Sequence, residues 1–289
     1  MEKYIEKFIR YLEIEKNYSF HTITNYKLDL EGFNNFVAGT EPEKIDYLNL
    51  RKYLAVLKEK NFGNRTVSRK LSALRSFFRF LCREGYLKTN PILMLSSPRM
   101  DKRLPSFMTE EEVGRLIESA FAHNPKDLAG LRDRAILEVF YSSGLRISEL
   151  VGLNLEDIDF ISGIIKVRGK GKKERIVPVG ETALAAIKKY LDKRDKNTDI
   201  LFLNHHQRRI SARGVRFVLV KYFKNCGIKP GVSAHTFRHS FATHLLNRGA
   251  DLRTVQELLG HANLSSTQIY THLTTDKLKS VYDKAHPHA

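Results

Sequence analysis

Residues 233–249 read SAHTFRHSFATHLLNRG, and the order of their apolar and polar side chains predicts an amphipathic helix. With about 100° of rotation per residue, one face carries three apolar side chains: Phe237, Phe241 and Leu245. His244 projects with that core face, whereas His235 and Arg238 lie about 60° apart on a different face. An imidazole beside a guanidinium suits a cluster of anionic oxygens such as a phosphate.

The same stretch also has the spacing of a metal site, because His235 and His239 are four residues apart. A zinc site would need a third ligand and a carboxylate helper. The positions between the two histidines hold Thr236, Phe237 and Arg238, and a fixed cation repels a metal ion. We therefore expect no metal at this helix.

The composition points to a polyanionic partner. The chain has 289 residues, enough for two domains, and 49 Lys+Arg against 32 Asp+Glu give a net charge of +17. Such an excess is typical of nucleic-acid binding, although lysines can also serve only solubility. The two cysteines, Cys82 and Cys226, indicate neither a disulfide framework nor a metal cluster. The charged N-terminus is not a signal peptide, and no apolar run predicts a membrane span.

The first part of the chain predicts a helical domain over residues 1–96. The last of its four helices, within residues 65–85, is the most informative. Its apolar face holds Val67, Leu71, Leu74, Phe78 and Leu81. Its opposite face is basic and hydroxyl-bearing, which suits DNA phosphates and base edges, although such a face can also be merely solvated: Arg65, Arg69, Ser72, Ser76 and Arg79.

Residues 97–107 are rich in proline and charge and predict a linker, so that a second domain spans residues 108–289. A capping box at Thr109–Glu112 opens its first helix, and Gly144 marks the end of the next. Two strands, Ile164 to Val167 and Arg175 to Val179, flank a Gly-Lys-Gly-Lys turn, and further helices follow. The fold class is therefore mainly α with a small β-sheet.

Five more residues are candidates, four for chemistry and one for DNA contact. Arg146 follows a glycine helix stop, where it could seat an anion or simply pair with Glu149. Lys170 lies at the glycine-flanked turn, with Lys172 beside it as a further candidate for DNA contact. His261 follows a helix end, and Tyr270 lies on an expected short helix. Taken singly, each also has an ordinary surface or packing explanation.

Taken together and in this order, these residues resemble the active-site set of the tyrosine recombinases, the lambda-integrase family. GLRISEL, RGKGKKER, HTFRHSFATHLL and LLGHANLSSTQIYTH are similar to the Xer-type members. The resemblance covers essentially the whole chain and implies six catalytic positions: Arg146, Lys170, His235, Arg238, His261 and Tyr270. It implies that the two arginines clamp the phosphate oxygens while Tyr270 attacks, forming a 3′-phosphotyrosyl intermediate. The two histidines would add hydrogen bonds, and Lys170 would protonate the leaving 5′ oxygen, with no metal or other cofactor.

The resemblance also implies a two-domain, C-shaped clamp on double-stranded DNA, with a helical core-binding domain and an α+β catalytic domain. The protein would bind a specific recombination site and assemble as a homo- or hetero-tetramer on two such sites. Whether it also needs a DNA translocase as activator is left open by the resemblance. Residues 278–289 resemble the helix that docks into a neighbouring protomer. The expected role is resolution of chromosome or plasmid multimers in the cytoplasm, at the nucleoid.

Two other interpretations are kept. A mobile-element integrase or a type IB topoisomerase-like enzyme would share the chemistry. A DNA-binding architectural protein would need neither Tyr270 nor Lys170.

Overall fold

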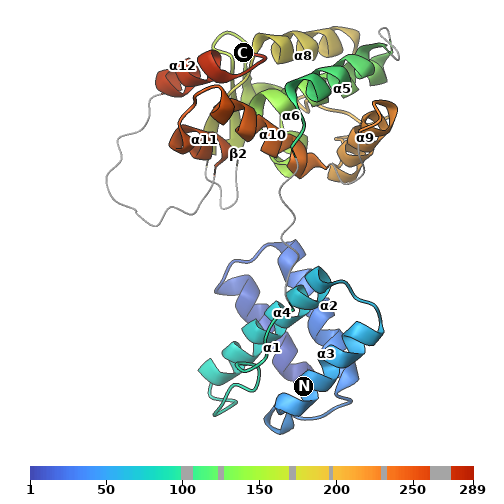
Figure 1. The fold of residues 1–289 in the computed structure, drawn as a ribbon, viewed down its shortest axis with the longest axis vertical. Helices are drawn as coiled ribbons and strands as arrows, with labels where there is room; N and C mark the ends of the chain where they lie inside the picture. Colours follow the sequence, from blue (N-terminus) through green and yellow to red (C-terminus); the bar gives the residue numbers. More distant parts are fainter. Residues whose placement is uncertain (99–106, 123–126, 169–173, 195–197, 229–232, 261–274) are drawn as a thin grey trace. The chain divides into compact units, whose positions relative to one another are not determined.

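The structure is a computed structural model and describes residues 1–98, 107–122, 127–168, 174–194, 198–228, 233–260 and 275–289. By its contacts the chain forms two compact units, Met1–Arg103 and Leu104–Ala289 (Figure 1). The predicted fold class, mainly helical with a small sheet, is confirmed. Within the described part of the chain, no helix is long and apolar enough to cross a membrane.

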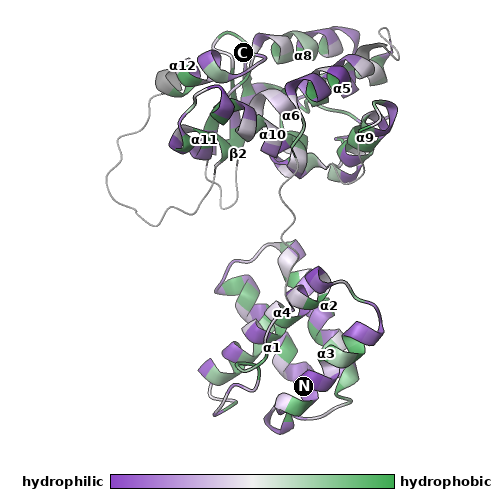
Figure 2. Cartoon of the chain, in the orientation of Figure 1, coloured by the Kyte–Doolittle hydropathy of each residue, from purple (hydrophilic) through white to green (hydrophobic). Residues whose placement is uncertain are grey.

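The N-terminal unit is a bundle of helices around an aromatic core. Its elements are α1 (Glu2–Ile14), α2 (Phe20–Phe36), the 3₁₀ turn η1 (Pro42–Lys44), α3 (Tyr47–Glu59) and α4 (Asn64–Arg83). Side-chain caps start two of the helices: Ser19 Oγ accepts from the Thr22 amide, and Asp46 Oδ1 accepts from the Asn49 amide at 2.8 Å. Each helix mixes hydrophobic and hydrophilic residues, as expected where only one face is buried (Figure 2).

The two faces of α4 lie as the sequence predicts. All five residues of the apolar face are buried, each with no more than 1% of its surface exposed. The basic face is exposed at Arg65, Arg69, Ser72 and Arg79 and half-buried at Ser76. One feature was not expected: Asp29 of α2 is almost fully buried and forms an ion pair with Arg69 and, at 3.0 Å, with Lys70. A carboxylate from the neighbouring helix therefore offsets part of the positive charge of this face.

The C-terminal unit combines a three-stranded antiparallel sheet with helices, in the strand order β1-β2-β3. Its strands are β1 (Ile158–Asp159), β2 (Ile164–Arg168) and β3 (Glu174–Pro178). The helices and the 3₁₀ turn η2 are α5 (Glu110–Ala122), α6 (Leu128–Ser143), α7 (Ile147–Gly152), η2 (Leu155–Asp157), α8 (Glu181–Lys193), α9 (Ala212–Asn225), α10 (Ala234–Asn247), α11 (Leu252–Leu259) and α12 (Thr275–Ala285). The capping box at Thr109 and Glu112 is present. The two predicted strands are found within one residue of their expected bounds, whereas the two-residue β1 was missed.

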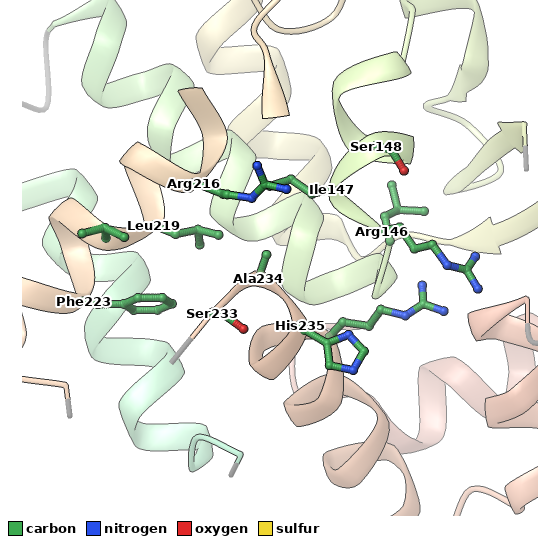
Figure 3. A pocket seen from close by; sticks show the side chains of 12 residues that line it. Arg146, Ile147, Ser148, Arg216, Leu219, Phe223, Ser233, Ala234 and His235 are labelled. Atoms are coloured by element: carbon green, nitrogen blue, oxygen red, sulfur yellow. The ribbon is translucent and has the colours of Figure 1, made fainter. Parts of the chain in front are cut away.

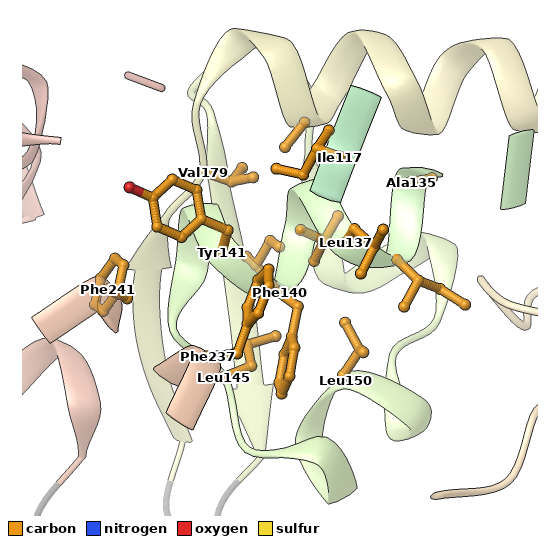
Figure 4. Close-up of a cluster of buried hydrophobic side chains, with 14 of the residues drawn as sticks. Ile117, Ala135, Leu137, Phe140, Tyr141, Leu145, Leu150, Val179, Phe237 and Phe241 are labelled. Carbon is orange, nitrogen blue, oxygen red and sulfur yellow. The ribbon is translucent and has the colours of Figure 1, made fainter. Parts of the chain in front are cut away.

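α6 is the central helix of this unit, packed against α5, α8 and α10. The ring of Phe140 on α6 stacks on Phe237 of α10 with centroids 5.5 Å apart (Figure 4). The helix ends at Gly144 with a φ of +55°, a left-handed conformation that glycine adopts without strain. This turn places the residues after α6 beside α10.

α12 packs on the C-terminal unit of its own chain. Tyr282 is 1% exposed, and its hydroxyl lies 2.6 Å from Ser142 Oγ on α6. The same Ser142 oxygen accepts a hydrogen bond from the Gly180 amide at 2.7 Å. The helix is therefore an integral part of the unit's core in the single chain.

Candidate active site

α10 presents the two faces that its sequence predicts, since Phe237, Phe241 and Leu245 are fully buried. His235 is exposed and lines a cavity, and Arg238 reaches the same cavity although its side chain is only 7% exposed. His244 lies on the core side, as predicted. Its Nε2 donates to the Met108 carbonyl, its Nδ1 lies 2.8 Å from the Tyr141 hydroxyl, and burial lowers its pKa. A neutral, fully bonded His244 belongs to the core rather than to the cavity.

Arg146 is positioned by the turn that follows α6. It is the N-cap residue of α7, with extended backbone angles. Its amide donates to Glu149 Oε2 at 2.7 Å, and its Nη1 donates to Glu149 Oε1 at 2.9 Å. The side chain is 45% exposed and lines the cavity. The pairing with Glu149 that the sequence left open is thus present, and the guanidinium still faces the cavity.

Glu149 is the centre of the cluster. Its side chain is 5% exposed, and it accepts from Arg146 and from Arg175 of β3. Burial raises the pKa of this carboxyl, but hydrogen bonds from Arg175 and from the Arg146 amide outweigh burial and bring the pKa to about 2. Glu149 is therefore an anion across the whole physiological pH range.

Arg175 makes the most complete set of contacts in the cluster. Its Nη1 and Nη2 donate to the two Glu149 oxygens at 2.8 and 2.9 Å, a bidentate pair. It is only 16% exposed. In the register of the sheet it stands opposite Val167 and two residues before Val177, and both of these valines are buried. Alternation along β3 therefore turns Arg175 toward the interior of the unit.

Three arginines converge on the end of α11. Each donates to one of three consecutive carbonyl oxygens, those of the last two residues of α11 and of its C-cap residue Gly260: Arg175 Nε to Leu258 at 3.2 Å, Arg238 Nη2 to Leu259, and Arg146 Nη2 to Gly260 at 3.1 Å. Carbonyls at a helix end have no partner within the helix, and they lie at the negative end of the helix dipole. Guanidinium groups from three different elements satisfy these carbonyls.

Arg146, His235 and Arg238 line one cavity of about 640 Å³ (Figure 3). The Arg146 guanidinium and the His235 ring point toward the same end of it. The opposite wall comes from α9, which contributes Arg216 and the apolar side chains of Leu219, Val220 and Phe223. A cavity with several cations at one end and an apolar wall suits an anionic group attached to a larger molecule.

The charges of the cluster are unbalanced. Three guanidinium groups surround one carboxylate, so two positive charges have no counterpart within it. Burial and the neighbouring charge of Arg146 lower the pKa of Arg238 to about 10, so it remains protonated at neutral pH. An arriving phosphate would relieve this repulsion.

The remaining predicted catalytic positions, Lys170, His261 and Tyr270, lie outside the described residues, as does Lys172. The structure thus brings together the three described members of the set. Among the described residues, no group of three or more His, Cys, Asp or Glu side chains could hold a metal ion.

Comparison with known proteins identifies the family. Residues 106–277 match the Phage integrase family, and residues 5–85 match the Phage integrase, N-terminal SAM-like domain. The chain is 49% identical to Tyrosine recombinase XerC of Thermodesulfovibrio yellowstonii, over 98% of this chain and 96% of the relative. It is 46% identical to Tyrosine recombinase XerC of Halalkalibacterium halodurans, over 100% and 98%.

The chain belongs to the phage integrase family. It is an Xer-type site-specific tyrosine recombinase, an enzyme of DNA strand transfer. Among solved structures it is similar in fold to the XerH site-specific recombinase bound to palindromic difH substrate in a post-cleavage complex. That similarity has a TM-score of 0.74 and 24% identity, and it covers 96% of this chain and 83% of the other.

Sequence reasoning missed two members of the recombinase's cluster and one cation in the wall of the cavity. Glu149 was noted only as a partner of Arg146, and Arg175 and Arg216 were not singled out. A signal for Arg175 existed, because it occupies an inward position of a predicted strand, where an arginine needs a buried partner. Nothing in the sequence indicated that α9 would form a wall of the same cavity.

Proposed function

We propose that this recombinase cuts and rejoins duplex DNA through a 3′-phosphotyrosyl intermediate on Tyr270. The observation that supports this most strongly is the convergence of Arg146 and Arg238 on one cavity, around a buried carboxylate. Both arginines also hold the last turn before residues 261–274, which include Tyr270. The two arginines that would bind the phosphate therefore also hold the helix end that directly precedes the segment bearing Tyr270.

The charge of the cluster fits phosphoryl transfer. A phosphodiester carries one negative charge, and a second develops on its oxygens as the nucleophile attacks in line. The arginine cluster has two unmatched positive charges, so it complements the transition state better than the ground state. Arg146 and Arg238 would bond the two non-bridging oxygens from the cavity side.

Each remaining residue has a defined task. The Tyr270 oxygen bonds to phosphorus while the bond from phosphorus to the 5′ oxygen breaks. Lys170 gives a proton to that leaving oxygen, and His235 and His261 bond the phosphate and take up the tyrosine proton. Attack by the freed 5′ hydroxyl of a partner strand reverses these steps and releases the enzyme.

The two units would divide the work between binding and chemistry. We assign DNA binding to residues 1–96, through the exposed basic face of α4, and catalysis to residues 108–289, with a linker at 97–107. Closure of both units around duplex DNA as a C-shaped clamp is part of this proposal. Arg65 and Arg79 are its most available cations, since Arg69 is paired with Asp29.

Recombination needs two DNA sites, so we propose a homo- or hetero-tetramer that resolves chromosome or plasmid multimers at the nucleoid. The relatives named XerC favour this role over that of a mobile-element integrase. A DNA translocase is a candidate activator. α12 would pass to a neighbouring protomer. Deletion of residues 277–289 should uncouple the protomers, and unchanged recombination by the truncated protein would contradict this docking. Because Tyr282 is buried in its own unit, the melting temperature is measured alongside to detect damage to the core.

Covalent trapping tests the chemistry. The protein is mixed with nicked fragments of its host's genomic DNA in excess EDTA, denatured with detergent and examined for a DNA-linked band. We expect a band with the wild type and none with Tyr270→Phe, and sequencing of the attached DNA gives the target site. Equal bands would disprove the assignment of Tyr270. DNA binding without a band in either protein would mean either that an activator or partner is missing or that the protein is an architectural binder.

A further inference from the structure

Arg175 is the one arginine of the cluster that does not line the cavity. All three of its guanidinium nitrogens are used inside the protein, two by Glu149 and one by the Leu258 carbonyl. It therefore differs from Arg146 and Arg238, whose guanidinium groups reach the cavity. Whatever Arg175 contributes to the reaction must pass through the groups that it holds.

The first of these groups is Glu149. Its two oxygens are shared between Arg175 and Arg146, and the amide of Arg146 bonds it as well. Because Arg175 binds both oxygens, it fixes the plane of the carboxylate. The orientation of the Glu149 carboxylate in turn sets the direction in which the Arg146 side chain extends from the start of α7. The position of the Arg146 guanidinium, which faces the cavity, thus depends on Arg175.

The second group is the end of α11. Gly260 has a φ of +63° and lies directly against Arg175: a Cβ added there would come within 3.0 Å of the arginine's Cδ and Nε. Together with the bond from Nε to the Leu258 carbonyl, this contact fixes the last turn of the helix. The chain continues from Gly260 directly into His261 and, nine residues later, Tyr270.

We propose that Arg175 is a positioning residue for DNA strand cleavage, which aligns Arg146 through Glu149 and anchors the end of α11 from which the tyrosine-bearing segment starts. The proposal rests on the function proposed above. It assigns two different roles to the arginines of the cluster. Arg146 and Arg238 contact the phosphate, whereas Arg175 contacts Glu149 and the end of α11 and so positions the groups that act on the phosphate.

The test compares Arg175→Gln with Arg209→Gln. Arg209 is a matched control, because it also binds carbonyl oxygens inside the same unit, those of Val151 and Leu153, while its hydrogen bonds within the described part of the chain go to no member of the cluster. The substrate is the trapped DNA site with a nick beside the cleavage position, so that the short 5′-hydroxyl fragment diffuses away and the covalent product accumulates. Single-turnover cleavage rate, DNA affinity and melting temperature are measured for each protein.

We expect Arg175→Gln to slow cleavage by about 100-fold or more at saturating DNA, with affinity changed by less than about 3-fold. Arg209→Gln should lower the melting temperature to a similar extent with little effect on the rate. Arg175→Lys should restore stability but only part of the rate, since one ammonium cannot replace a bidentate fork. If Arg175→Gln is poorly folded, Arg175→Lys and Gly260→Ala provide the same comparison.

Two further measurements separate positioning from stability. In Arg175→Gln the buried Glu149 loses its main charged partner, so the pKa of its carboxyl rises, and the acid-side loss of cleavage rate should begin at a higher pH than in the wild type, at constant folded fraction. A double-mutant cycle with Glu149→Gln should be strongly non-additive, because the two residues act as one unit.

The outcomes distinguish the two proposals. Absence of a Tyr270-linked product in the wild type would overturn the proposed function itself. A wild type that cleaves, together with an Arg175→Gln variant that cleaves equally fast, would overturn only the role of Arg175. The role of Arg175 would also be overturned if Arg175→Gln loses no more cleavage rate than Arg209→Gln, or if the double-mutant cycle with Glu149→Gln is additive.

Discussion

Arg146 Nη2 lies 3.1 Å from the carbonyl oxygen of Gly260, although the two residues are 114 positions apart in the chain. The contact joins the start of α7 to the end of α11, and Nη1 of the same guanidinium is held by Glu149. Arg146 is thus fixed from two sides while its remaining donors are open to the cavity. This geometry depends on the planar fork of arginine rather than on positive charge alone.

We therefore predict that Arg146→Lys slows strand cleavage by about 100-fold or more while DNA affinity changes little. An ammonium keeps the charge but cannot bond Glu149, the Gly260 carbonyl and a phosphate oxygen at once. Single-turnover cleavage and fluorescence anisotropy with labelled DNA measure the two quantities. Arg248→Lys is the control, since Arg248 pairs with Glu110 outside the cluster. Cleavage by Arg146→Lys at a rate near that of the wild type would show that charge alone suffices.

The sequence was sufficient to predict the parts of the site that depend on one helix. The faces of α10 follow from the rotation per residue, and Gly144 was recognisable as a helix stop. The pairing of Arg69 with Asp29 was not predictable in this way, because it joins two helices whose relative rotation depends on packing. The same holds for Arg175, whose partners Glu149 and Leu258 are brought to it by the fold of the whole unit.

Gly144 contacts both the hydrophobic core and the arginine cluster. Its φ is +55°, and a Cβ on this residue would overlap the ring of Phe241. Its carbonyl oxygen accepts from Arg238 Nη1 at 2.6 Å. We predict that Gly144→Ala lowers the free energy of unfolding by about 3 kcal/mol or more and also slows cleavage. Gly152→Ala on α7 should be nearly neutral, because no atom lies within 4 Å of the added Cβ. Equal melting temperatures of the two variants would contradict this prediction.

The contact between Asp29 and Arg69 predicts unequal roles along the basic face of α4. Arg65 is exposed, whereas the charge of Arg69 is already offset by a buried carboxylate. Arg65→Ala should weaken DNA binding and reduce the slope of log affinity against log salt by about 0.9, the value for one lost phosphate contact. Arg69→Ala should leave the slope nearly unchanged but lower the melting temperature. Equal slopes for both variants would indicate that Arg69 leaves Asp29 for the DNA.

The last prediction concerns the pH dependence of stability at the C-terminus. His286 is 4% exposed, and its ring stacks on Tyr282 with centroids 4.7 Å apart. Its Nδ1 accepts from the His288 amide at 3.0 Å, while its Nε2 has no hydrogen-bond partner among the described residues. Burial, together with the nearby His288, lowers the pKa of His286 to about 3. The folded protein therefore holds this ring neutral.

Unfolding releases the ring to water, where its pKa returns to 6.5. Below that value the unfolded state binds a proton that the folded state does not, so stability falls as the pH drops from 6.5 toward 3. Between pH 7.5 and pH 5.5 this histidine alone should remove about 1.4 kcal/mol. His244, whose pKa is also lowered by burial, acts in the same direction. His286→Phe should therefore lose about 1.4 kcal/mol less than the wild type over this interval, as measured by calorimetry at both pH values. If the wild type and His286→Phe lose the same free energy of unfolding over this interval, His286 is already protonated, or already hydrated, in the folded state.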